Sequence, residues 1–469
     1  MSNNKPNILF ILTDQHRVDT LKAYGGKTCK TPNIDLLTEE SVVFNGAYAS
    51  CPVCTPARAS LQTGLYPHNH EMRNNTYEPG CKFNELPNSP ELLSNKLKKQ
   101  HYSLGYTGKW HLGFGPTEVG YDGDDFPGHG AGGHDYVQYH DYLKEKGQEV
   151  KLENKITGHY KGHWAAEVVS PVETTVEYFL TDRAIHYIDQ FRQKSNPFYF
   201  QLNFWGPHEP YIAPTKYLDL YRNLEIEPWP NFYDKSTNKP TIHKVKRSGT
   251  TEWKKFEPYI KHYYANVSLI DEQIGRLLNY LKEHGLYEDT IIIFSADHGE
   301  SLGIHGGLCD KNFFMYEETC RIPLIVKPAK KLEQTRYEDR FVGTCDIYSS
   351  ILDWSGVPEE EINRDGRSFV PLVNNENVND WPDHVVTEGN GLAEILYTQR
   401  MIRHGHMKYV FNCGDTDELY DLQNDPYELI NEIENLAYKD TLQPLRELLA
   451  DWMEKHNDRV LEQYKDLCR

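Results

Sequence analysis

The stretch PNILFILTDQ (residues 6–15) decides the fold, because it is apolar from Ile8 to Leu12 and then turns abruptly polar. Two later stretches, FYFQLNFWGPH (198–208) and TIIIFSADHGE (290–300), follow the same pattern. Near-continuous apolar runs of this length are typical of strands that are buried on both faces of a parallel sheet. Each run ends in Asp, His or Glu, and open α/β sheets place their active sites at the carboxyl ends of their strands.

Helical segments alternate with these strands, which makes α/β the predicted fold class. PELLSNKLKKQ (90–100), TTVEYFLTDRAIHYIDQFRQ (174–193) and YYANVSLIDEQIGRLLNYLKEHG (263–285) are predicted as helices. The last of them carries apolar residues at helical spacing and stops at Gly285, a favourable C-cap. We therefore predict a large, mostly parallel sheet sandwiched by helices.

The character of the sequence changes near residue 370. Short strand-like segments separated by turns follow, and an amphipathic helix is predicted over 439–456. We predict a main α/β domain over residues 1–370 and a smaller C-terminal α+β subdomain with a short antiparallel sheet over 371–469. Residues 115–165 and 222–258 show no period and are predicted as long surface segments.

Composition narrows the function classes. The 469 residues include 69 acidic and 50 basic side chains, a net charge of −19 that argues against nucleic acid or an anionic membrane surface as the main partner. The mean hydropathy is −0.69, and no apolar run approaches the roughly 20 residues of a membrane-spanning helix. The first apolar run is too short for an export signal, and the nine cysteines are scattered, so we expect a cytoplasmic protein.

Cys51 and Cys54 lie three positions apart in CPVCTPARASLQTG (51–64). This pair could be a redox motif or half of a zinc site, but zinc needs a second ligand pair and the sequence has no other Cys-x-x-Cys. Counted from Cys54, the run becomes Cys-x-Pro-x-Arg followed by Leu-x-Thr-Gly. In that register it resembles the signature of the sulfatase family, which implies an alkaline-phosphatase-like fold.

The resemblance implies that Cys54 is oxidised to Cα-formylglycine by a separate formylglycine-generating or anaerobic sulfatase-maturing enzyme. The hydrated aldehyde is the nucleophile in that family. A geminal diol keeps a second hydroxyl with which to expel sulfate, whereas a plain thiol would leave a sulfur-linked intermediate that is hard to hydrolyse. Arg58, four residues on, would share a helix face with Cys54 and hold the reacting oxygens.

A divalent cation is the second implied component. Asp14 and Gln15 end the first apolar run, and Asp297 and His298 end the last. The resemblance implies that these side chains and the modified Cys54 hold one cation; oxygen ligands suit Ca²⁺, which we favour, and an imidazole also suits Mn²⁺ or Zn²⁺. The Asp-Gln and Asp-His pairs depart from many sulfatases and are similar to those of iduronate-type and choline-type sulfatases and of phosphonate monoester hydrolases.

Further positions match the family's catalytic set. In GYTGKWHLG (105–113), Lys109 is implied to bind a sulfate oxygen and His111 to be the base that releases sulfate, a task that suits a pKa near neutrality. His208 and Lys311 are implied to stabilise or protonate the departing alcohol. The residues that we expect nearest the rest of the substrate are Arg17, Asn74, Asn75 and His305.

The sequence therefore predicts a sulfuric ester hydrolase that releases inorganic sulfate from a sulfated small molecule or saccharide. A phosphonate monoester or phosphodiester hydrolase on the same scaffold is the alternative. A binding protein that keeps the fold and has lost the chemistry is a third interpretation, which the intact set of matching residues opposes. The natural substrate, the identity of the metal and the formation of a homo-oligomer are left open by the sequence.

Overall fold

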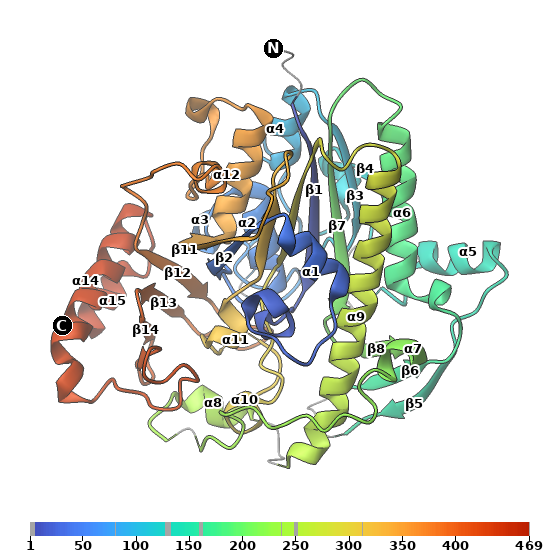
Figure 1. The fold of residues 1–469 in the computed structure, drawn as a ribbon. Coiled ribbons are helices and arrows are strands. Elements are labelled where there is room, and N and C mark those ends of the chain that lie inside the picture. Colours follow the sequence, from blue (N-terminus) through green and yellow to red (C-terminus); the bar gives the residue numbers. More distant parts are fainter. Residues whose placement is uncertain are drawn as a thin grey trace.

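β1 (Asn7–Asp14) lies at the centre of an eight-stranded sheet with the order β11-β2-β10-β9-β1-β7-β3-β4 (Figure 1). The structure is a computed structural model that describes residues 5–79, 81–126, 133–158, 163–235, 237–247, 252–311 and 313–468. The other strands of this sheet are β2 (Val42–Tyr48), β3 (Ser103–Gly108), β4 (Asp122–Gly123), β7 (Phe198–Pro207), β9 (Thr290–Ala296), β10 (Leu324–Lys327) and β11 (Arg336–Gly343). β10 is antiparallel to both of its neighbours, and the other pairs are parallel, as predicted.

The three apolar runs of the sequence form three adjacent strands of this sheet. Phe10 of β1 pairs with Ile293 of β9 on one side and with Gln201 of β7 on the other. Side chains alternate along a strand, so Phe10 enters the core cluster on one face of the sheet and Ile11 the cluster on the other. Both faces of β1 are therefore buried, which explains why its sequence lacks a polar alternation.

Helices cover both faces of the sheet (Figure 1). The helices that pack on one face are α2 (Cys54–Thr63), α4 (Leu93–Lys99) and α12 (Thr344–Ser355), and those on the other are α1 (Pro32–Glu39), α6 (Val176–Phe191) and α9 (Trp253–Glu283). α9 begins well before the predicted start at residue 263, because Phe256 and Ile260 extend its buried side; Pro258, inside the helix, hid this start in the sequence. Among the described helices, none is both long and apolar enough to cross a membrane.

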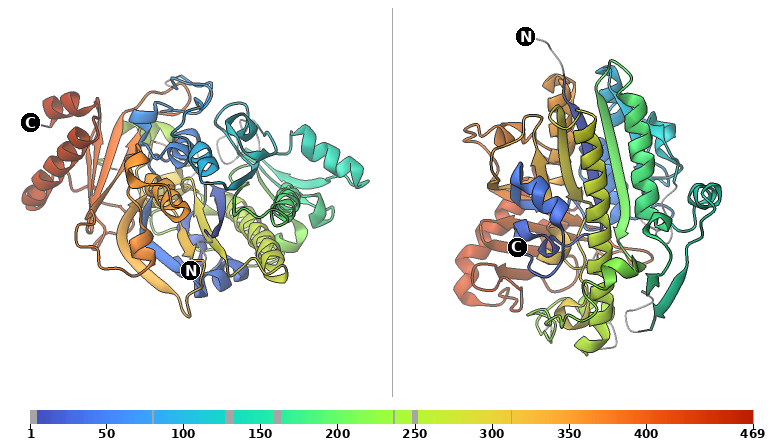
Figure 2. Two further views of the ribbon diagram at one scale, coloured as in Figure 1. Left: turned by 90° about the horizontal axis from the view of Figure 1, so that it is seen from above. Right: turned by 45° about the vertical axis from the view of Figure 1, so that its right-hand side comes forward.

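The two segments predicted as long surface excursions contain regular structure. Residues 115–165 include α5 (Val137–Glu145) and β5 (Leu152–Ile156), and β6 (Ala165–Val168) joins β5 to β8 (Tyr211–Pro214) in a three-stranded sheet. α5 and β5 project at one end of the molecule (Figure 2). The short helices of the fold are α3 (Pro67–His70), α7 (Thr215–Leu218), α8 (Thr241–Lys246), α10 (Ile304–Gly307), α11 (Glu317–Cys320) and α13 (Val370–Val373).

A small antiparallel sheet forms the C-terminal part, as predicted. Its strands are β12 (His384–Gly389), β13 (Gln399–His404), β14 (Met407–Asn412) and β15 (Glu418–Asp421), in sequence order, and α14 (Lys439–Lys455) and α15 (Leu461–Leu467) pack on it (Figure 2). The Glu388 N–H donates to the carbonyl of Ser50 at 2.8 Å, and Thr387 Oγ1 donates to that of Ala49 at 2.8 Å. β12 is thus bonded to the segment that leads into α2. The boundary at residue 370 stays a prediction.

The polar ends of the strands meet at one edge of the large sheet. β1, β7, β9 and β3 are parallel neighbours, so Asp14, Asp297, Lys109 and His208 all leave the sheet on the same side. The loop after β2, which is also parallel to them through β10, brings Cys54 to this edge. The topology therefore gathers residues that are almost 300 positions apart in the sequence.

We predict that Gly108→Ala lowers the free energy of unfolding by about 3 kcal/mol or more, because a left-handed backbone and a clash must both be accommodated. Gly108 has a φ of 97°, and a Cβ there would lie 1.8 Å from the carbonyl oxygen of Asn203. Gly120 is the matched control, since its φ is 95° but nothing lies within 4 Å of a Cβ. Gly120→Ala should cost only about 1 kcal/mol in denaturant unfolding; equal losses would contradict the predicted clash.

Candidate active site

Four buried side chains bring their donor atoms together at this edge of the sheet. Asp14 ends β1, Asp297 and His298 follow β9, and Cys54 is the first residue of α2. One donor atom from each residue lies within 4.8 Å of the other three, and Cys54 Sγ is 3.3 Å from His298 Nε2. The structure thus brings together four of the five residues that the sequence predicted as metal ligands.

His298 is oriented as metal-binding histidines are. Its Nδ1–H donates to the carbonyl of Gly299 at 2.9 Å, which leaves the Nε2 lone pair for the cluster. Burial opposes a charge on this imidazole, but Asp297 and Cys54 outweigh burial and raise its pKa to about 9 in the protein alone. Two carboxylates, an imidazole and position 54 form a donor set that fits a divalent cation such as Ca²⁺, Mn²⁺ or Zn²⁺.

Arg58 holds the two carboxylates in place. Its Nε donates to Asp297 Oδ2 and its Nη2 to Asp14 Oδ2, each at 2.9 Å. The third donor, Nη1, bonds the carbonyl of Lys109 at 2.8 Å. Because Arg58 lies one turn after Cys54 on α2, the guanidinium fixes the start of this helix against the ends of β1 and β9 and against the loop after β3.

The backbone of Lys109 is held by three donors, which fixes where its side chain begins. Tyr106 Oη donates to the Lys109 carbonyl at 2.7 Å and Asn203 Nδ2 at 3.1 Å, in addition to Arg58. The side chain then reaches Asp14 Oδ2 at 2.6 Å and Cys54 Sγ at 3.6 Å. A rigid base and a long cationic side chain place positive charge beside the position that the family resemblance makes the nucleophile.

Cys51 and Cys54, the two cysteines of the segment 51–64, differ in electrostatic environment. Burial opposes ionisation of Cys54, but Lys109, Lys311 and His298 overcome it and hold the pKa of the thiol well below its ordinary value. Burial raises the pKa of Cys51 well above its ordinary value, and Glu388 adds to the rise. Cys54 and not Cys51 therefore interacts with Lys109, Lys311 and His298, in agreement with the register Cys-x-Pro-x-Arg and against a paired redox motif.

Lys311 and His208 lie together on another side of the cluster. Lys311 Nζ is 2.7 Å from His208 Nε2 and 2.6 Å from Gln15 Oε1, and His208 Nε2 is 4.0 Å from Asp14 Oδ1. The His208 Nδ1–H donates to the carbonyl of Glu209 at 2.7 Å, so Nε2 is the acceptor that faces Lys311. A lysine and a histidine thus share a hydrogen bond at the site.

His111 is a buried imidazole that interacts with the Cys54 sulfur. Its carbonyl accepts from Thr55 Oγ1 at 2.7 Å, and its backbone has a φ of 55°. Within the described ranges, its Nδ1 has no hydrogen-bond partner. Burial lowers its pKa to about 4, although the contact with Cys54 acts the other way. The ring is therefore neutral near pH 7 and able to accept a proton.

Gln15 and Glu300 form a clamp that the sequence did not reveal. The amide oxygen of Gln15 accepts from Lys311, and its Nε2 donates to Glu300 Oε2 and to Asp310 Oδ1. Glu300 Oε1 accepts the backbone N–H groups of Leu302 and Asp310, both at 2.8 Å. The buried Glu300 therefore folds the loop that carries Lys311 back onto the end of β1. The side chain of Gln15 reaches that loop, and only its backbone N–H bonds the cluster, at Asp297 Oδ1.

The residues expected near the rest of the substrate lie in different surroundings. Arg17 is buried, bonds both oxygens of Asp19 and donates to the carbonyl of Ser301. Asn75 Oδ1 accepts the Thr55 N–H at 3.2 Å, beside Cys54. Asn74, its neighbour, donates to the carbonyls of Pro79 and Ala393.

His305 belongs to another buried cluster. It is bonded to Asn231, Asp234 and Lys239, stacks on Tyr316 with the ring centres 3.8 Å apart, and shows no contact with the four-residue cluster among the described residues. These contacts give His305 a structural role in joining two loops, and they account for its burial without any contact to a substrate.

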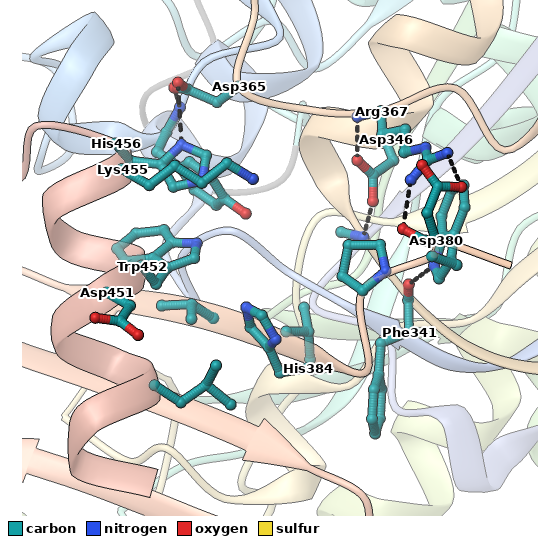
Figure 3. A pocket seen from close by; sticks show the side chains of 17 residues that line it. Phe341, Asp346, Asp365, Arg367, Asp380, His384, Asp451, Trp452, Lys455 and His456 are labelled. Atoms are coloured by element: carbon teal, nitrogen blue, oxygen red, sulfur yellow. Dashed lines mark hydrogen bonds and ion pairs between the residues drawn. The ribbon is translucent and has the colours of Figure 1, made fainter. Parts of the chain in front are cut away.

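A hollow of about 440 Å³ lies elsewhere, between α14 and the segments around Asp346 and Asp380 (Figure 3). None of the predicted site residues lines it. Some of its polar groups bond one another: Arg367 bonds Asp380, and Asp346 accepts the backbone N–H of Arg367. It is a gap between the large sheet and the C-terminal helices, and it is separate from the cluster around Cys54.

Comparison with known proteins identifies the family of the chain. The profile of the Sulfatase family matches residues 6–357, and that of the N-sulphoglucosamine sulphohydrolase C-terminal region matches residues 303–455. The choline-sulfatase of Rhizobium meliloti is 28% identical, with 93% of this chain and 84% of that protein aligned. The chain belongs to the sulfatase family and is a sulfatase hydrolase.

Solved structures share the fold. BT4656, in complex with its substrate D-glucosamine-2-N,6-O-disulfate, has a TM-score of 0.77 at 23% identity, with 97% of this chain and 99% of that chain covered. The phosphonate monoester hydrolase of Agrobacterium radiobacter has a TM-score of 0.81 at 23% identity, with 96% of each chain covered. The alkaline-phosphatase-like architecture expected from the signature is thereby confirmed.

We predict that Glu300→Gln lowers kcat/KM at least about tenfold, because an N–H₂ group in place of an acceptor leaves buried donors unpaired at a cost of about 1–3 kcal/mol. The melting temperature should fall as well, and the loss of activity should persist at temperatures where the variant is folded. Glu454→Gln, on the exposed side of α14, is the control and should change neither quantity. Full activity of a folded Glu300→Gln enzyme would exclude the clamp.

Proposed function

We propose that this sulfatase releases inorganic sulfate from a sulfated small molecule or saccharide, with formylglycine at position 54 as the nucleophile and one divalent cation, Ca²⁺ in preference, at Asp14, Asp297 and His298. The observation that carries the proposal is the meeting of these three side chains with Cys54 Sγ at the sheet edge, all buried, with Lys109 beside the sulfur. The fold of BT4656, whose complex holds a disulfated glucosamine, supports a saccharide as substrate class.

Formylglycine and the cation would supply the reactive groups. The hydrated aldehyde offers one hydroxyl to attack sulfur and a second whose deprotonation expels sulfate, and the cation would act as a Lewis acid toward the oxygens. The residues of the chain hold the ligands in position and supply positive charge for the anion. Arg58 keeps Asp14 and Asp297 in position, and Lys109 and Lys311 place two ammonium groups where a sulfate anion needs them.

Proton transfers follow from the positions of the histidines. His111, neutral and in contact with position 54, is the base that accepts a proton from the nucleophile's second hydroxyl. Lys311, whose ammonium group donates to His208 Nε2, is the group that gives a proton to the departing alcohol, and His208 holds that ammonium group in place. Separate groups thus serve the release of the alcohol and the release of sulfate.

Hydrolysis of phosphonate monoesters or phosphodiesters is the second candidate function. It is favoured by the fold shared with the phosphonate monoester hydrolase, and by the Asp-Gln and Asp-His pairs at the strand ends. A comparison of kcat/KM for an aryl sulfate and for an aryl phosphonate monoester separates the two. We expect the sulfate to be preferred, and hydrolysis of the phosphonate alone would overturn the proposal.

We predict that mass analysis of the active enzyme finds an aldehyde in the peptide that contains Cys54, and that Cys54→Ala abolishes activity. Cys51→Ala is the matched control, since Cys51 is equally buried but has Glu388 and Arg400 as charged neighbours in place of Lys109 and Lys311. It should retain both the modification and the activity. Full activity in protein whose Cys54 remains a thiol would disprove the formylglycine mechanism.

We predict that chelation removes activity and that Ca²⁺ restores it. Asp297→Asn should weaken the affinity for the cation about a hundredfold, because a carboxylate ligand is lost; titration calorimetry of the matured enzyme measures this directly. Asp339→Asn, on the outer strand β11, removes a carboxylate outside the cluster and should leave the affinity unchanged. Activity that is indifferent to chelators would argue against a metal.

A further inference from the structure

Glu78 is a carboxylate near the cationic site whose role nothing above explains. It lies in the loop after α3, where its N–H donates to the carbonyl of Asn75 at 3.1 Å. Asn75 in turn accepts the N–H of Thr55, the residue after Cys54. Two hydrogen bonds therefore link Glu78 to the first turn of α2, and it interacts electrostatically with Cys54, Lys311 and Asp310.

One oxygen of Glu78 is fixed by the C-terminal part of the protein. Glu78 Oε2 accepts the Ala393 N–H at 2.9 Å, from the loop that joins β12 to β13. The carbonyl of Ala393 accepts from Asn74 Nδ2 at 3.2 Å, so the two loops are bonded in both directions. The side chain is half-buried in a defined position rather than free to turn into solvent.

The remaining oxygen of Glu78 is what sets this residue apart. Asp14 and Asp297 are paired with Arg58, and Asp310 is paired with Lys311 at 3.1 Å. Glu78 has no ion pair within the described ranges of the chain, and its only fixed partner is a neutral N–H. It is a carboxylate without an ion-pair partner among the described residues, close to groups that are arranged to bind an anion; burial raises its pKa, and the more distant Lys311 acts the other way.

Such a charge weakens the binding of a sulfate ester unless the substrate compensates it. A carboxylate repels the sulfate group over the short distances of a partly dehydrated site. A neutral hydroxyl could donate to Glu78 but would leave the repulsion in place. A cationic group on the alcohol part of the substrate removes it, because it pairs with Glu78 while the sulfate pairs with Lys109 and Lys311.

We propose that Glu78 binds a positively charged nitrogen on the alcohol part of the substrate, so that the enzyme selects sulfate esters of ammonium-bearing alcohols. This inference rests on the proposed sulfatase function and narrows its substrate class. Amino alcohols, quaternary ammonium alcohols and sugars with a free amino group belong to this class. Glu78 is a specificity residue: it contacts the part of the substrate that leaves, and the chemistry at sulfur does not need it.

The test compares two sulfate esters of the same shape with the matured enzyme. Choline sulfate carries a trimethylammonium group, and 3,3-dimethylbutyl sulfate has a neutral tert-butyl group in its place. We expect the native enzyme to hydrolyse the cationic ester with a kcat/KM at least about tenfold higher. In Glu78→Gln this ratio should fall close to one through loss of the cationic substrate, with kcat/KM for the neutral ester unchanged or raised.

Glu394→Gln is the matched control. Glu394 follows Ala393 in the same loop and is exposed, so the change alters the net charge equally without touching the fixed carboxylate. It should keep the native ratio. Equal kcat/KM for the two esters in the native enzyme, or an equal effect of Glu78→Gln on both, would overturn the proposal while leaving sulfatase activity established. Failure to hydrolyse any sulfate ester, with hydrolysis of an aryl phosphonate, would instead overturn the proposed function, and this inference with it.

Discussion

The bridge that Arg58 makes between Asp14 and Asp297 is the interaction on which the site depends. It joins the ends of two adjacent strands to the helix that presents position 54, and all three side chains are buried. A buried ion pair of this kind contributes less to stability than its short distances suggest, but removal of one partner leaves an uncompensated charge at a cost of about 3–5 kcal/mol. The planar guanidinium also fixes angles as well as distances, which a lysine in its place would not do.

The same bridge explains how an acidic protein holds an anion. Arg58 and Lys109 together offset the charges of Asp14 and Asp297, and the ammonium group of Lys109, 2.6 Å from Asp14 Oδ2, also lies 3.6 Å from Cys54 Sγ. Burial opposes the charge of Lys311, but Asp310 and Cys54 outweigh it and raise its pKa above the ordinary value. The net charge of −19 is therefore spread over the body, while the field at the site is set by groups a few ångströms away.

Patterns within single strands predicted most of the fold. Apolar runs buried on both faces identified β1, β7 and β9, and parallel strands must share an edge, so the polar residues that follow them were bound to meet. The start of α9 was missed because Pro258 interrupts the helical pattern. The regular elements between residues 115 and 165 were missed because β5 is an exposed strand, with no apolar face to mark it in the sequence.

What the sequence could not predict are contacts made by loops that turn back. Glu300 ends the apolar segment 290–300, which the sequence pattern identified. Its role, however, depends on a hydrogen bond from the Asp310 N–H, which a turn of the loop brings back to it. Leu302 and His305 both have positive φ, so neither the direction of this loop nor the burial of His305 could be inferred from residue types. The contact of Glu78 with Ala393 spans 315 positions and has no local signal at all.

The hydrogen bonds from β12 to Ala49 and Ser50 have a consequence for the order in which the molecule is completed. Synthesis runs from the N-terminus, so position 54 leaves the ribosome more than 300 residues before the strand that secures the segment in front of it. For most of that interval the thiol lacks the sheet edge formed by β9, and for all of it the bonds of β12. In the finished protein Cys54 is 1% exposed. The thiol at position 54 is therefore more accessible in the growing chain than in the folded protein, where the last fifth of the sequence holds the segment in front of it.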